Sequence, residues 1–155
     1  MIDFPNNVIE IFKDYLKGPN DEHEVIGRPL RINDPDNAIG IFATVWTPTE
    51  TEIGQIEPVL GRYNLILQSM VKVATEEEGV AEHTALAKRI RIMLYRDPSL
   101  RVALKQTSVE THDMKERVQR YGLTQQRFLS NEVDGTHIYL SVTEVFIETE
   151  LVPIG

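Results

Sequence analysis

The chain contains no cysteine among its 155 residues. Without thiols it can form no disulfide scaffold, thiolate zinc site or iron–sulfur cluster, and it has no cysteine nucleophile. No apolar run approaches the roughly 20 residues that a membrane-spanning helix needs. The first five residues also lack the basic start and apolar stretch of a signal peptide. We therefore expect synthesis in the cytoplasm and no membrane partner.

Recognisable catalytic motifs are also missing. The histidines are His23, His83, His112 and His137. They do not form the paired-histidine helix motif of zinc proteases, and no glycine-rich phosphate cradle occurs. Ser69, Ser130 and Ser141 lack a local nucleophile signature. The sequence therefore predicts neither an enzyme nor a bound cofactor, with no catalytic residue to name.

Three acidic groups deserve comparison with known kinds of site. Residues 21–24 offer carboxylates and an imidazole to a cation, while residues 34–37 resemble a calcium loop without its central glycine and bidentate glutamate. Glu144, Glu148 and Glu150 share one strand parity, as a pair of acid–base carboxylates would. Solvated acidic loops and a solvent-facing row explain all three more simply, so we expect no metal site.

Length and composition indicate one ordinary globular domain spanning residues 1–155. Hydrophobic residues make up 41% and charged residues 26% of the chain, which is typical of soluble domains. A chain of this length can bury roughly two-thirds of its unfolded surface. No internal repeat or linker divides it.

Charge is distributed unevenly around the formal net charge of −8. Residues 1–87 hold 6 basic and 15 acidic side chains (−9), residues 88–127 hold 10 and 4 (+6), and residues 128–155 hold 5 acidic and no basic ones (−5). The acidic average repels free nucleic acid, yet the basic segment can face an acidic partner. Two interpretations stay open: a solvated basic surface with ordinary ion pairs, or a contact with the acidic region of another copy.

Apolar periodicity predicts helices in three places. Val8, Phe12 and Tyr15 form one stripe, and Asn7 with Glu10 has the spacing of a capping box. Acidic residues 76–78 favour the start of a second helix, where the helix dipole is positive. Its apolar side consists of Leu86, Ile90, Met93 and Leu94. Asp97 is suited to cap a third, short helix that begins at Pro98 and runs through Leu104.

Extended patterns occupy residues 24–30, 38–47, 63–74, 107–133 and 136–152, with a long irregular connection at 47–61. Asp134-Gly135 predicts a hairpin turn. In the last segment Ile138, Leu140 and Val142 alternate, and Val145 then takes the opposite parity. This phase change predicts a bulge, or a strand that outruns its own core. The order of elements predicts an α+β domain, with helices packed on a single antiparallel or mixed sheet.

Several stretches, taken in order, resemble the tail terminator proteins of long-tailed phages, especially those of actinobacterial phages. They are residues 52–54 (EIG), 58–63 (PVLGRY), 94–100 (LYRDPSL), 126–132 (QRFLSNE) and 139–145 (YLSVTEV). The resemblance implies a structural virion protein that forms a hexameric ring on the tail tube, stops its polymerisation and docks the head connector. It implies contacts with the tube protein and with connector proteins, passage of DNA through the channel without specific binding, and no cofactor.

A ring uses heterologous contacts, in which different surfaces of adjacent copies meet. Candidates for contacts between subunits or with the tube are Trp46, Glu52, Arg89, Arg91, Arg96, Arg127, Glu148 and Glu150. Trp46 is the candidate anchor because buried aromatic residues often dominate interfaces; a place in the core is its alternative. The function also has alternatives: another head–tail connection component, such as a stopper or adaptor, or a small-molecule-binding or hydrolytic domain with a deep pocket.

Overall fold

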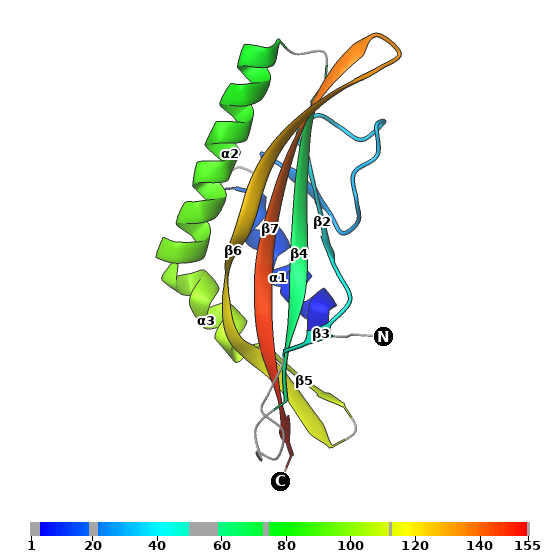
Figure 1. Cartoon of the computed structure of the whole chain (residues 1–155). Coiled ribbons are helices and arrows are strands. Elements are labelled where there is room, and N and C mark those ends of the chain that lie inside the picture. Colours follow the sequence, from blue (N-terminus) through cyan, green and yellow to red (C-terminus); the bar gives the residue numbers. More distant parts are fainter. Residues whose placement is uncertain (1–3, 19–21, 50–58, 73–74, 112, 155) are drawn as a thin grey trace.

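Helices cover one face of a long mixed sheet in the computed structural model of the chain (Figure 1). The structure describes residues 4–18, 22–49, 59–72, 75–111 and 113–154. The helices are α1 (Phe4–Leu16), α2 (Glu76–Arg96) and α3 (Pro98–Gln106). The strands are β1 (Glu24–Ile26), β2 (Ala38–Ala43), β3 (Thr47–Pro48), β4 (Val59–Lys72), β5 (Ser108–Thr111), β6 (Met114–Val133) and β7 (Thr136–Pro153). The predicted α+β class is confirmed.

Three long strands form the centre of the 7-stranded sheet, whose order is β1-β2-β4-β7-β6-β5 with β3 paired to β4. Strand β1 is parallel to β2, and all other pairs are antiparallel. The 18 residues of β7 span about 60 Å at roughly 3.3 Å per residue. The ribbon of β6 and β7 therefore runs past the helices (Figure 1). None of the described helices combines the length and apolar character needed to cross a bilayer.

The hydrophobic core lies between the sheet and the helices. Alternate residues of the central strands point toward the helices, as the period of a strand requires. Fully buried core side chains include Phe12, Leu16, Ile39, Ile41, Leu65, Ile90, Leu100, Leu104 and Ile147. The apolar side predicted for the second helix is confirmed, because all four of its residues are buried.

The predicted phase change in the last strand does not come from a bulge in that strand. Strands β4 and β7 pair without interruption from Val59↔Leu151 to Lys72↔Ile138, so β7 carries no bulge. The register shifts lie in β6, between Val118 and Arg120 and between Leu123 and Gln125. Odd-numbered residues of β7 lie on the helix side of the sheet, and even-numbered ones lie on the helix-free side. Ile138 and Leu140, near the start of β7, have apolar neighbours on the helix-free face, whereas Val145 and Ile147, farther along, pack in the core beneath the helices. The apolar residues of β7 therefore change faces along the strand.

Other boundaries also differ from the sequence predictions. Helix α1 begins at Phe4, so Asn7 lies inside it and caps nothing at its start. Residues 59–61, expected in an irregular connection, belong to β4 because they pair with Thr149–Leu151 of β7. The long segment at 107–133 is divided into β5 and β6 by Asp113, whose φ is 64°. The Asp134-Gly135 turn is confirmed, with φ values of 50° and 79°.

Asp97 joins the two helices that meet at an elbow, as predicted. Its side chain accepts hydrogen bonds from the backbone nitrogens of Ser99 and Leu100, while Pro98 occupies the first position of α3. We expect Asp97→Ala to lower the free energy of unfolding by about 1 kcal/mol, because two backbone donors lose their acceptor. Urea denaturation measures the loss. Asp97→Asn, which keeps the acceptor, is the control, and equal losses for both variants would contradict the capping role.

Candidate functional site

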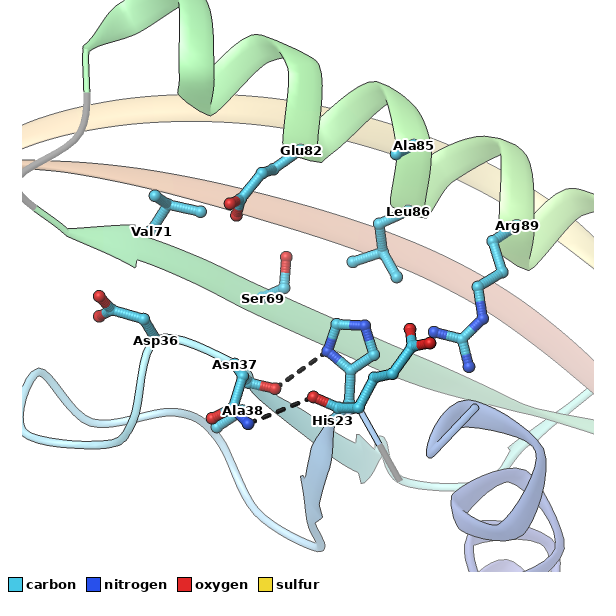
Figure 2. Close-up of a pocket in the computed structure, with 11 residues that line it drawn as sticks. His23, Asp36, Asn37, Ala38, Ser69, Val71, Glu82, Ala85, Leu86 and Arg89 are labelled. Carbon is cyan, nitrogen blue, oxygen red and sulfur yellow. Dashed lines mark hydrogen bonds between the residues drawn. The ribbon is translucent and has the colours of Figure 1, made fainter. Parts of the chain in front are cut away.

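A cleft of about 410 Å³ opens between α2 and the loops that precede β1 and β2 (Figure 2). Its polar lining consists of Glu22, His23, Asp36, Asn37, Ser69, Glu82 and Arg89. The His23 Nδ1 atom lies 3.0 Å from the backbone oxygen of Asn37, and the Asn37 side chain donates to the carbonyl oxygen of Glu22 at 3.2 Å. The two loops therefore hold each other at the rim of the cleft.

The cleft carries several acidic side chains but few of the contacts that a catalytic or metal site needs. Within the described part of the chain, the hydrogen bond of the His23 ring goes to a backbone oxygen rather than to Ser69 or a carboxylate. No group of three or more histidine, aspartate or glutamate side chains among the described residues is arranged to hold a metal ion. Of residues 21–24, which were compared with a cation site, Asp21 lies outside the described residues. The cleft thus offers charge complementarity to a basic partner.

Arg89, a candidate contact residue, serves the subunit's own fold. Its Nη2 atom donates to the carbonyl oxygens of Tyr15 at 3.2 Å and Leu16 at 2.5 Å. These carbonyls belong to the last turn of α1, where a cation also interacts favourably with the helix dipole. Arg89 therefore ties α2 to α1, and reversing its charge would disturb the fold of the chain itself.

In the loop that resembles a calcium site, an arginine side chain binds the aspartate carboxylate. Both guanidinium nitrogens of Arg28 donate to the Asp34 carboxylate at 2.8 Å, and the backbone nitrogen of Arg31 adds a third donor at 2.6 Å. The hydrogen bonds from Arg28 hold the pKa of Asp34 well below its usual range. Lys72 also donates to the backbone oxygen of Asp34. The carboxylate therefore holds this loop together, and the bond from Lys72 ties the loop to β4.

A partly buried histidine–serine pair was missed by the sequence analysis. The His83 Nδ1 atom lies 2.7 Å from Ser141 Oγ, and the imidazole ring packs 5.1 Å from the ring of Phe128. Ser141 is only 4% exposed, in the middle of β7 beneath α2, so a substrate cannot reach it. One turn earlier, a Cβ atom on Gly79 would lie 2.6 Å from Tyr139 Cγ. The glycine and histidine one turn apart are the sequence signal for this close docking of α2.

Burial lowers the pKa of His83 in the folded protein. The unfolded chain, with a histidine pKa of about 6.5, then binds the proton more readily, so stability rises with pH in this window and falls as pH drops below about 6.5. We expect His83→Gln to flatten the pH dependence of stability between about pH 7 and pH 5. Urea denaturation at several pH values measures it, with the exposed His137→Gln as the control. The hypothesis is wrong if both variants keep the wild-type pH profile.

An arginine–glutamate ladder crosses the helix-free face of the sheet. Arg127 lies 3.4 Å from Glu144 and Arg120 lies 3.1 Å from Glu148, while Arg117 pairs with Glu150. The guanidinium groups of Arg62 and Arg120 also stand 4.7 Å and 5.6 Å from the centre of the Phe146 ring. Glu148 is 8% exposed, so the expected solvent-facing row of glutamates is wrong for this residue. Three of the ten basic residues at 88–127 therefore meet the last acidic block within one chain.

Trp46 packs on its own sheet. Its Nε1 atom donates to Thr149 Oγ1 at 3.1 Å, and that hydroxyl donates to Glu116 Oε2 at 2.8 Å. The indole lies so close above Gly61 that an added Cβ atom would come within 1.9 Å of it. The ring is half-buried, so these contacts leave part of it available to a partner.

We expect Gly61→Ala to displace Trp46 and to lower the free energy of unfolding by about 1–3 kcal/mol, the usual cost of overpacking. Trp46 is the chain's one tryptophan, so its fluorescence spectrum reports the displacement directly. Gly27→Ala is a matched control because nothing lies within 4 Å of the added Cβ atom there. An unchanged spectrum and stability for Gly61→Ala would contradict this packing.

The remaining candidate residues make fewer polar contacts within the described part of the chain. Arg91 and Arg96 are exposed on α2 and have no ion-pair partner among the described residues. Glu52 lies outside the described residues. The structure brings Arg127, Glu148 and Glu150 together on the ladder but keeps Arg96 apart from them, at the α2–α3 elbow.

Comparison with known proteins supplies no family. Neither a protein-family model nor a curated protein matches this chain. Function must therefore be inferred from the surfaces that the fold leaves open.

Proposed function

We propose that this chain is a structural virion protein that assembles into a ring on the end of a phage tail tube. The ring stops tube polymerisation, joins the tail to the head connector and lets DNA pass through its channel. The proposal assigns no catalytic step to the chain. It is based on the resemblance to tail terminators, which implies a hexamer, and on surfaces that a single copy leaves uncovered.

The open edge of β6 is the observation that carries the proposal. Strand β5 pairs with β6 only as far as Arg117, and no described strand pairs with its outer edge beyond that residue. Lys105 donates to the backbone oxygen of Gln119, and the Tyr95 hydroxyl accepts from the backbone nitrogen of Leu123, so the helices occupy part of the edge. The rest continues toward the Asp134-Gly135 hairpin. An open edge of this length favours association with another chain.

The helix-free face offers a second uncovered surface. A hollow of about 400 Å³ on this face is lined by Leu30, Gln68, Met70, Leu129, Ser130, Asn131, Ile138 and Leu140. Leu129 is 45% exposed although it belongs to this apolar group. Exposed apolar surface beside a polar ladder is typical of surfaces that meet another protein. A neighbouring copy or the tube protein would remove it from water.

The stretches that resemble tail terminators lie at positions that shape the fold, in the β6–β7 hairpin and at the α2–α3 elbow. Residues 126–132 pair with residues 137–143 across the β6–β7 hairpin, so two of the stretches form one ribbon. Residues 94–100 build the elbow, where Asp97 caps α3 and Tyr95 reaches β6. These placements support a shared fold as the reason for the resemblance.

We expect electron micrographs of the purified protein, alone or with tail tubes, to show rings of uniform diameter. Loss of the protein from its phage should yield tails of uncontrolled length, because nothing would end tube growth. Native mass spectrometry provides the subunit number. Monomers at every concentration, and no ring when tubes are present, would contradict the proposal.

The alternatives have different outcomes in the same experiments. A stopper or adaptor would leave tail length normal, and its loss would produce DNA-filled heads that leak. A small-molecule-binding or hydrolytic domain would use the cleft beside His23 and would leave both tails and heads intact.

A further inference from the structure

We propose that a basic groove at the α2–α3 elbow of one copy receives the acidic rim of the cleft of the next copy. The groove is the surface lined by Tyr95, Arg96, Asp97, Arg101, Lys105, Arg120 and Tyr121. The acidic rim consists of Glu22, Asp36 and Glu82. This inference rests on the proposed ring and assigns one of its subunit contacts.

Two adjoining hollows form the groove, with volumes of about 240 Å³ and 320 Å³. They share Leu94, Tyr95 and Arg101 among their lining residues, so they are continuous around the elbow. Four cationic side chains line them, and the Asp97 carboxylate is occupied by the backbone nitrogens of α3. The groove is therefore shaped and charged to accept carboxylates.

Two of the cationic side chains in the groove have no polar partner among the described residues. Lys105 donates to the backbone oxygen of Gln119, and Arg120 pairs with Glu148. Arg96 and Arg101 are exposed, and neither has an ion-pair or hydrogen-bond partner for its guanidinium group among the described residues. These two arginines belong to the part of the basic segment that β7 does not neutralise. They are available to a second molecule.

The carboxylates of the acidic rim are likewise unpaired or only weakly paired among the described residues. Glu22 and Glu82 are exposed, and neither carboxylate has an ion-pair partner among the described residues. Asp36 lies 4.0 Å from Lys72 and is 61% exposed at its side chain, so its pairing is weak. Figure 2 shows Glu82 and Asp36 on opposite sides of the cleft. A guanidinium group that entered between them would meet carboxylates from α2 and from the loop before β2.

The groove and the rim are different surfaces of the chain, with Arg96 at the C-terminal end of α2 in the groove and Glu82 in its N-terminal half at the rim. Arg120 and Tyr121 place the groove beside β6, whereas the rim adjoins β1 and β2, on the other side of β4 and β7 in the sheet order. A contact between two different surfaces is heterologous, and its repetition closes a ring when the rotation permits. Complementary charge would set the register of neighbouring copies. A second copy is therefore a fitting occupant for the groove.

Charge exchange between the two surfaces tests the contact. One variant carries Arg96→Glu with Arg101→Glu, and another carries Glu22→Lys with Glu82→Lys. Because each alone places like charges together, we expect each to raise the concentration needed for half-maximal assembly about tenfold or more. An equimolar mixture should restore rings of alternating variants, and so should all four changes in one chain. Lys88→Glu with Lys115→Glu is the control, since it changes net charge equally on surfaces away from the groove.

Native mass spectrometry and light scattering measure the assembled mass, and circular dichroism checks that each variant folds. Rescue by mixing, with wild-type ring mass and untouched assembly of the control, supports the inference. Wild-type assembly by the groove variant, or no rescue on mixing, overturns it and leaves the proposed ring standing. Groove-dependent binding of duplex DNA with unchanged assembly also overturns it. A wild-type protein that never self-associates or caps tubes contradicts the proposed function itself.

Discussion

The pairing of β7 with both β4 and β6 is the constraint on which the rest of the structure depends. Successive residues of a strand face opposite sides, so a slip of one residue would exchange the two faces of β7. Val145 and Ile147 would then leave the core, and Glu144 and Glu148 would enter it. The unbroken register with β4 prevents this exchange. The helices and the charged ladder therefore both depend on one strand alignment.

The two register shifts in β6 explain how its arginines reach a single face. Arg117, Arg120 and Arg127 do not share one parity, and a regular strand would place Arg120 opposite the other two. One extra residue between Val118 and Arg120, and another between Leu123 and Gln125, places all three arginines on the helix-free side within reach of a glutamate of β7. The same shifts keep Tyr121 and Phe128 facing the helices. Bulges of this kind redirect side chains without breaking the sheet.

Local chemistry made part of this structure predictable. A cap followed by proline specified the elbow at Asp97, and the Asp134-Gly135 pair specified its hairpin, because each feature acts within a few residues. The ladder was not predictable, since parity along β6 is interrupted by bulges that depend on its neighbours. The bonds from Arg89 to α1 and from His83 to Ser141 join residues 73 and 58 positions apart. No short-range pattern contains such contacts, and the resemblance to tail terminators was carried by stretches of only a few residues.

Internal pairing changes the meaning of the charge asymmetry. If the basic and acidic blocks of different copies met throughout their length, the arginines of β6 would have to leave partners that already lie within 3.1–3.4 Å in Arg120–Glu148 and Arg127–Glu144. Breaking a pair that includes a buried carboxylate such as Glu148 is costly. Contacts between copies are therefore best made by charges that the fold leaves over. Arg96 and Arg101 on one side, and Glu22 and Glu82 on the other, meet that condition without opening the sheet.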